Sequence, residues 1–321
     1  MCNSAGVSRS GYYSWVDRQS KESERELRDR KDFDLILEAY KFRGYDKGRR
    51  GIRMRLLHMG IVMNEKKIRR LMNKYGLVCT IRSANPYRRM MKAIKTNNYA
   101  KNELERKFEE YGPGIVLLTD ITYLFYGPNR DKAYLSVIKD AFTKQILAYV
   151  ISPSLEIDFV LETIELLFTN HKDDIKADAL IHSDQGCHYT SIDFIKLLKD
   201  KELRRSMSRR GNCWDNAPQE SFFGHMKDEI EISKCITYND LKEVIDDYID
   251  YYNNDRYQYR LAKLSPNEYL NYYTTGIYPL KGLIPEPEDK NPKPYPKKKK
   301  TEISQSSNTE SNSPSNDSSS A

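Results

Sequence analysis

The spacing of apolar residues changes near residue 110, from a helical period to a strand-like one. Before that point, apolar residues recur at helical spacing and predict amphipathic helices. With their caps, these helices span 8–15, 20–42, 49–59 and 64–75. Gly60 fits a turn between the last two helices, Asn64 fits an N-cap and Gly76 fits a C-terminal cap. Two short helices around a glycine turn predict a helix-turn-helix, although similar pairs also occur in ordinary helical cores.

After residue 110 the pattern predicts strands that alternate with helices. Short apolar or alternating runs predict strands at 115–118, 134–139, 145–152 and 178–182. Amphipathic patterns predict helices at 156–170 and 191–201, followed by helices that begin near Asn216, Asn239 and Ser265. A meander of three strands, then a helix, a strand and a helix, is the order of an RNase H-like fold. We therefore expect an α/β protein with an RNase H-like mixed five-stranded sheet flanked by helices, preceded by an all-α helix-turn-helix region.

These patterns divide the chain into four expected parts. They are an N-terminal helical segment, a helix-turn-helix region with a basic linker, the RNase H-like core with its C-terminal helices, and a disordered tail, over 1–42, 43–98, 110–272 and 285–321. The tail combines a lysine run with a Ser, Asn and Thr tract, and such a composition buries too little apolar surface to fold.

Composition narrows the class of protein. Charged residues make up 31% of the chain, and no apolar run approaches the ~18 residues that span a bilayer. No secretory signal is visible. The five cysteines form no CxxC pair, which indicates neither a disulfide framework nor a thiolate zinc cage. A reducing cytoplasm fits this composition best.

The net charge of +7 is distributed unevenly. Residues 43–95 hold sixteen Lys and Arg against two acidic residues, whereas residues 115–270 hold nineteen basic against twenty-six acidic residues. A basic block beside an acidic domain indicates that one part holds a polyanion and the other processes it. A solvated helical surface is the plainer alternative. On the predicted second helix of the helix-turn-helix, the side chains expected to meet DNA are Lys66, Lys67, Arg69, Arg70 and Lys74.

Three carboxylates stand in settings that could bring them together. Asp120 follows one apolar run, Asp184 ends another predicted strand, and Glu220 lies about one turn into a helix that Asn216 can cap. If the two strands are neighbours, the two aspartates lie side by side, and Glu220 lies above them at the start of its helix. Such a trio suits two divalent ions about 3.5–4 Å apart, the arrangement used for phosphodiester cleavage. The oxygen ligands favour Mg²⁺ or Mn²⁺. Spacing alone leaves nuclease, RNase H and transposase open.

Other side chains near these elements have simpler interpretations. His182 fits a satisfied histidine at a strand end, and His225 lies off the face that carries Glu220. Asp140 and Asp215 fit turn and cap roles. We expect Trp214 to pack under the predicted helix.

The amino-acid sequences that flank the three carboxylates are more informative about the protein family than the spacing of the carboxylates. The three segments are Leu118-Thr119-Asp120-Ile121-Thr122-Tyr123, His182-Ser183-Asp184-Gln185-Gly186 and Asn212-Cys213-Trp214-Asp215-Asn216-Ala217-Pro218-Gln219-Glu220. These sequences resemble those of the DDE transposases related to retroviral integrases, most closely the OrfB-type transposases of the IS-three group of bacterial insertion sequences. Three further segments carry the same resemblance: Gly6 to Tyr13, Tyr252 to Arg256 and Leu264-Ser265-Pro266. The resemblance covers most of the chain.

The resemblance implies a set of roles and partners. Asp120, Asp184 and Glu220 would bind two Mg²⁺ or Mn²⁺ ions, and Lys227, on the same helical face as Glu220, would contact DNA. The implied activity is cleavage at the terminal inverted repeats of an element and transfer of the 3′ ends to target DNA. The implied partners are double-stranded DNA, further copies of the chain in a synaptic complex, and an upstream OrfA product joined by frameshifting. The expected location is the bacterial cytoplasm, at the nucleoid.

Two other functions remain open at this point. A catalytically silent protein could occupy the element ends and regulate the full fusion transposase. A hydrolase acting on RNA in hybrids could use the same core, but the helix-turn-helix disfavours it because A-form helices give side chains little access to the major groove.

Overall fold

The computed structural model describes residues 6–20, 23–45, 47–79, 102, 104, 110–208 and 216–287. The predicted linker at 87–98, Trp214, Asp215 and the predicted tail beyond 287 lie outside the described residues. No helix in the described part of the chain is long and apolar enough to cross a membrane.

The N-terminal part is helical, as the apolar spacing predicts. Its helices are α1 (Arg9–Ser20), α2 (Glu24–Lys41), α3 (Arg49–His58) and α4 (Glu65–Lys74). The side chain of Ser23 caps α2 by accepting from Glu26 N, so this helix starts a few residues later than predicted. Asn64 caps α4 as predicted, accepting from Lys66 N at 2.8 Å. Apolar side chains of α2, α3 and α4 share one core, which includes Ile36, Ile52, Leu56, Ile68 and Leu71.

The second part is built on a five-stranded sheet with the order β3-β2-β1-β4-β5. The strands are β1 (Val116–Tyr126), β2 (Asp131–Asp140), β3 (Ile146–Ser152), β4 (Leu180–Ser183) and β5 (Arg204–Met207). The first three form an antiparallel meander, whereas β4 runs parallel to both β1 and β5. This is the mixed RNase H-like sheet predicted from the sequence. One prediction was wrong: β1 does not end near Asp120 but continues to Tyr126, because its later residues pair with β2.

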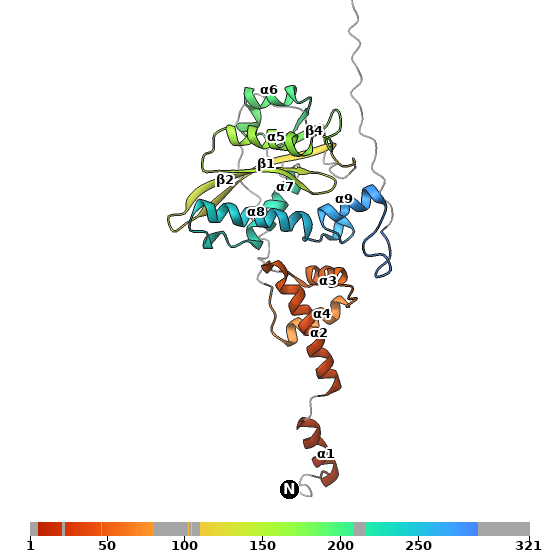
Figure 1. Cartoon of the computed structure of the whole chain (residues 1–321). Coiled ribbons are helices and arrows are strands. Elements are labelled where there is room, and N and C mark those ends of the chain that lie inside the picture. The colour runs from red at the N-terminus through yellow and green to blue at the C-terminus, as the bar shows by residue number, and fades with distance from the viewer. Residues whose placement is uncertain are drawn as a thin grey trace, which may run out of the picture.

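Helices cover both faces of the sheet (Figure 1). On one face α5 (Asp158–His171) and α6 (Ile192–Asp200) enclose a core with Leu117, Ile138 and Ile181. On the other face α7 (Ala217–Glu229) and α8 (Tyr238–Asn254) pack on side chains that include Leu135 and Val137. Ser265 and Pro266 open α9 (Pro266–Thr275) with a capping box, as predicted.

The helical part docks on the C-terminal helices of the core. The Arg43 guanidinium donates to the Asp250 carboxylate of α8 at 2.8 Å, and the Tyr45 ring stacks on Tyr251 with centroids 4.2 Å apart. The His58 ring stacks on Tyr257 at 3.6 Å. Leu57 of α3 adds apolar contacts with Leu264 and Leu280, so α3 is held against α8 and the segment that follows it.

Candidate active site and nucleic-acid interface

Asp120 lies within β1, and Asp184 directly follows the neighbouring parallel strand β4 at the same level. Leu118 of β1 pairs with His182 of β4, and each aspartate stands two residues further along its strand direction. Because parallel neighbours keep this register, Asp120 in the middle of β1 stands beside Asp184 at the end of β4. The prediction that these two strands are neighbours in the sheet is therefore confirmed.

Burial disfavours the charged form of both aspartates, and nearby hydrogen-bond donors oppose this effect. Burial raises the pKa of Asp120 to about 8, and the negative charges of Asp184 and Glu220 act in the same direction, against donors from Ile121 N–H and Asn216. Burial likewise raises the pKa of Asp184, although a bond from Gly186 N–H at 2.8 Å opposes this effect. Two partly buried carboxylates with raised pKa values favour a nearby cation.

Gly186 permits the tight turn that carries Asp184. A β-carbon at this position would lie 2.9 Å from Asp184 Oδ1, closer than real β-carbon contacts allow. A side chain here would therefore displace the carboxylate or break the bond from Gly186 N–H.

Glu220 lies in the first turn of α7, which begins beside β1. Pro218 stands in that first turn as predicted, and Glu220 itself is exposed. The prediction that Asn216 caps the helix with its side chain was wrong: its amide nitrogen instead donates to Asp120 Oδ2 at 2.9 Å. The buried Gln219 amide donates to Leu118 O at 2.7 Å. The start of the helix is thus fixed to the strand that carries Asp120.

The three carboxylates offer suitable metal donors but do not form a closed cluster. Within the described ranges, no group of three or more His, Cys, Asp and Glu side chains is arranged to hold a metal ion. The donor chemistry nevertheless fits a hard divalent cation, because every candidate ligand atom is a carboxylate oxygen. Burial is the main cause of the raised pKa of Asp120, and the neighbouring charges of Asp184 and Glu220 add to it. Asp120 and Asp184 lie side by side, and Glu220 stands in the first turn of the neighbouring helix α7.

The far end of α7 is anchored by a buried ion pair. The Arg256 guanidinium donates to Glu229 at 2.6 Å, and the Tyr248 hydroxyl donates to the same carboxylate at 3.0 Å. The side chain of Glu229 is 5% exposed. Lys227 lies half-buried in the last turn of α7, two residues before this pair.

The weaker candidates have structural roles. His182 is buried between the hydroxyls of Ser206 and Ser208, at 2.9 and 3.2 Å. The Asp140 carboxylate accepts from backbone N–H groups of the following turn, including Thr143 N at 2.6 Å. Burial lowers the pKa of His225, which favours its neutral form.

The basic residues of α4 fall into two groups. Lys67, Arg70 and Lys74 face α2, where they pair with Asp32, Asp29 and Glu26. The Arg70 guanidinium donates two bonds of 2.7 Å to the Asp29 carboxylate. These three cations therefore stabilise the packing of α4 on α2, a role that the sequence alone did not indicate.

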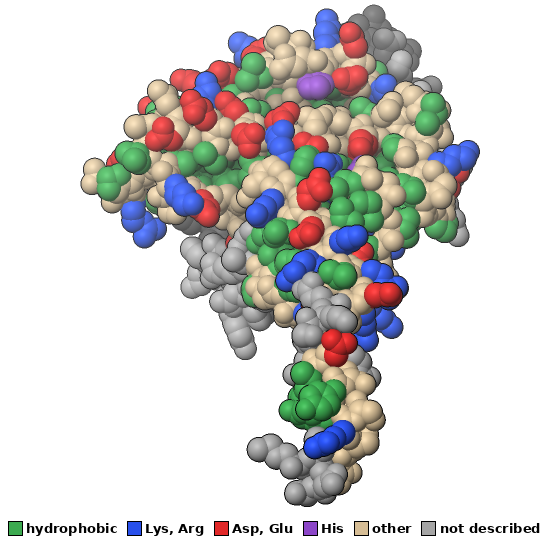
Figure 2. Space-filling model, turned by 60° about the horizontal axis from the view of Figure 1, so that its bottom comes forward, with side chains coloured by type: hydrophobic (Ala, Val, Ile, Leu, Met, Phe, Trp, Pro, Cys, Tyr) green, Lys and Arg blue, Asp and Glu red, His purple; other side chains and the backbone are tan. Residues whose placement is uncertain are grey.

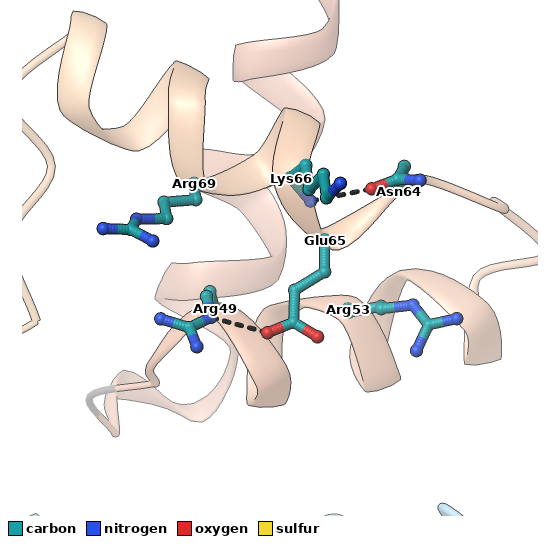
Figure 3. A pocket seen from close by; sticks show the side chains of 6 residues that line it. All are labelled: Arg49, Arg53, Asn64, Glu65, Lys66 and Arg69. Carbon is teal, nitrogen blue, oxygen red and sulfur yellow. Dashed lines mark hydrogen bonds and ion pairs between the residues drawn. The ribbon is translucent and has the colours of Figure 1, made fainter.

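Lys66 and Arg69 lie on the other side of α4, where they meet α3. With Arg49 and Arg53 they line a cavity of about 460 Å³ around Glu65 (Figure 3). Among the described residues, neither Lys66 nor Arg69 forms an ion pair. The spacing of Arg49 and Arg53, one helical turn apart, is the sequence signal that could have identified this second pair. Figure 2 shows Lys and Arg side chains gathered where the N-terminal helices meet the body of the protein.

Comparisons with known proteins agree with this organisation. Family models match at three places: an HTH-like domain at residues 26–85 and integrase core domains at 110–213 and 220–272. An uncharacterized 31 kDa protein of insertion element IS600 from Shigella sonnei is 30% identical over 280 residues, which cover 85% of this chain and 98% of that protein. Putative transposase InsK for insertion sequence element IS150 from Escherichia coli K12 is 32% identical over 225 residues, which cover 70% and 77%. Transposase InsF for insertion sequence IS3A from the same strain is 27% identical over 273 residues, which cover 84% and 93%.

The sheet order, the helical unit and these likenesses define a transposase with an integrase core and a helix-turn-helix domain. Within that class, the chain belongs to the IS3-type OrfB transposases.

Proposed function

We propose that this transposase cleaves DNA strands at the ends of its insertion sequence and transfers them to target DNA in a divalent-metal-dependent reaction. The observation that carries the proposal is the register of parallel β1 and β4, which sets Asp120 of β1 beside Asp184, the residue that follows β4. Glu220 stands in the first turn of the adjacent helix.

In this proposal Asp120, Asp184 and Glu220 hold two Mg²⁺ or Mn²⁺ ions. Bound ions of this kind supply an activated oxygen nucleophile and stabilise the leaving 3′ oxygen. The chain's own part is positional. Asn216 and Gly186 each donate to one aspartate, which fixes the direction of its oxygens. Gln219 fixes the start of α7 against β1, so Glu220 approaches from one side.

We place the duplex-binding surface on the α3 and α4 side chains that line the Figure 3 cavity. Arg49, Arg53, Lys66 and Arg69 form four cationic positions around Glu65. Lys66 and Arg69 stay in the proposal as DNA contacts, joined by the two arginines of α3. Lys67, Arg70 and Lys74 are reassigned to structural ion pairs, a role supported by their contacts with α2. Lys227 remains a proposed contact beside the carboxylates.

Joining two element ends requires that both be held at once, so we propose that the active form is a multimer. We also propose that it works as a fusion with, or as a partner of, an upstream OrfA product. Its DNA substrate places the proposed action at the bacterial nucleoid, in the cytoplasm.

A strand-transfer assay on the supercoiled element with Mg²⁺ or Mn²⁺ tests the proposal. Asp184→Asn and Glu220→Gln should each abolish joining while duplex binding persists. The exposed variant Asp173→Asn serves as a matched control and should remain active. Protection of the element ends without cleavage under either metal would instead identify a DNA-binding regulator.

A further inference from the structure

A groove runs between the helix-turn-helix domain and the core, along α7. We call it the α3–α7 groove. It has a volume of about 930 Å³, and its lining includes Arg50, Lys139, Ser221, Phe222, Tyr259 and Arg260. The last two belong to the short helix η6 (Tyr259–Leu261), which follows α8. Side chains from α3, α7 and η6 therefore face one space.

The groove is basic. Arg50, Lys139, Lys144, Arg256 and Arg260 line it, whereas Glu110 is the one carboxylate among its described lining residues. The Arg256 charge is offset by its ion pair with Glu229. Arg50 and Arg260 are exposed, and Lys139 lies at the floor, where it donates to Pro218 O at 3.1 Å. This excess of positive charge fits a polyanionic ligand.

An aromatic ring stands at the edge of this basic groove. Tyr259 is 46% exposed, and its ring lies 5.8 Å from the Arg50 guanidinium and 5.7 Å from the Lys263 ammonium. Arg53 donates to the Tyr259 hydroxyl at 2.9 Å, which fixes the ring on the side of α3. An exposed aromatic ring flanked by cations is the arrangement that stacks nucleobases in single-strand-binding proteins.

The groove connects the duplex-binding surface with the carboxylates. Arg53 lines the Figure 3 cavity and also holds Tyr259 at the groove. At the other end Ser221 lines the groove, and it follows Glu220 directly in α7. A strand that passes from the α3–α4 surface to the catalytic helix therefore crosses the groove.

We propose that the α3–α7 groove binds one DNA strand that is unpaired from its complement, with Tyr259 stacked on one of its bases. The bases of an intact duplex are stacked on each other, so a ring reaches a base face only after the strand has been unpaired. This inference rests on the proposed function. It adds to that proposal that the DNA reaching the carboxylates is a single, unpaired strand.

Fluorescence anisotropy with the full chain tests the inference. The probes are an oligothymidine of about 20 nucleotides and a blunt duplex of the element's terminal sequence. Tyr259→Ala should weaken oligothymidine binding by about 5- to 100-fold. Tyr259→Phe keeps the ring but loses the hydroxyl that Arg53 contacts, and it should retain most of this binding. Both variants lose the Arg53 contact equally, so any effect on duplex binding should be the same in the two. Tyr273→Ala on α9, also an exposed tyrosine, is the control and should match the parent chain.

Arg260→Glu supplies a second variant that does not depend on the ring, and it should also weaken oligothymidine binding. Circular dichroism confirms that each variant is folded. Equal oligothymidine binding by the parent chain, Tyr259→Ala and Arg260→Glu would overturn the groove assignment. If duplex binding and strand transfer persist in that case, the proposed function stands and only the groove proposal fails. If the parent chain binds neither probe, both proposals fail.

Discussion

The side-chain amide of Asn216 donates to Asp120 Oδ2 at 2.9 Å, and this bond joins the N-terminus of α7 to strand β1. The bond favours the ionised form of Asp120, against the effects of burial and of the neighbouring carboxylates. Asn216 therefore links the position of the helix that carries Glu220 to the charge of the aspartate beneath it.

Asn216→Ala should lower the strand-transfer rate near neutral pH by on the order of 10-fold, as is common when a residue that orients a metal ligand is lost. Without the amide donor the pKa of Asp120 rises further, so the loss should shrink as the pH is raised. A pH profile of the rate checks this, with the exposed Asn170→Ala on α5 as the control. A uniform loss at every pH would point to misfolding of α7 instead.

Asp120→Asn should stabilise the metal-free protein at alkaline pH. The ordinary pKa of Asp120 is 3.8 and its pKa in the folded protein is about 8, so between these values the folded state holds a proton that the unfolded chain has released. The free energy of unfolding therefore falls as the pH rises through this window. Asparagine removes this dependence, and we expect a gain of at least ~1 kcal/mol at pH 8 that fades toward pH 4.

Thermal unfolding of the parent chain and Asp120→Asn across that pH range measures the effect. Asp173→Asn on the exposed turn after α5 should follow the parent chain at each pH. Parallel curves for the parent chain and Asp120→Asn would contradict the raised pKa.

Arg256→Met should destabilise the core by ~3–5 kcal/mol, because it leaves the Glu229 carboxylate buried without its cation. Adding Glu229→Leu removes the uncompensated charge and should recover most of the loss. Urea unfolding of the parent chain, both single variants and the double variant measures the coupling between the two residues. If the double variant lost as much unfolding free energy as the two single variants together, the two residues would not act as a pair.

Substitutions on the two sides of α4 should separate DNA binding from folding. Lys66→Ala and Arg69→Ala should each weaken duplex binding and reduce the slope of log affinity against log salt by about 0.9, the value for one phosphate contact. Arg70→Ala should keep that slope but lower the melting temperature, because the Asp29 carboxylate loses both bonds that Arg70 donates and retains the one from Lys74. A reduced salt slope for Arg70→Ala with an unchanged melting temperature would instead assign Arg70 to the DNA-binding face.

Local sequence patterns were sufficient to predict the elements that position the candidate site. The apolar runs before Asp120 and Asp184 predict buried strands, and Pro218 marks the first turn of the helix that carries Glu220. These signals act within a few residues, so a single sequence contains them in full. A mixed five-stranded sheet of RNase H-like type was predicted from the succession of elements, although the order of its strands was not, and β5 (Arg204–Met207) was not located by its residues.

What the sequence did not predict depends on contacts between distant residues. Arg70 is 41 residues from its partner Asp29, and Asn216 is 96 residues from Asp120. A basic helix looks the same in sequence whether its cations face DNA or an acidic neighbour. Likewise, an asparagine before a helix fits a cap unless a carboxylate elsewhere offers a better acceptor.

The most direct test of the account is a crystal structure of the protein soaked with Mn²⁺ and measured by anomalous diffraction. The account predicts an anomalous peak between Asp120 and Asp184, within about 2.0–2.3 Å of an oxygen of each, with Glu220 as a further ligand of a bound ion. The peak should be absent in Asp184→Asn crystals soaked in the same way. Aspartates that stay free of Mn²⁺ at saturating concentration, in protein that still transfers strands, would contradict it.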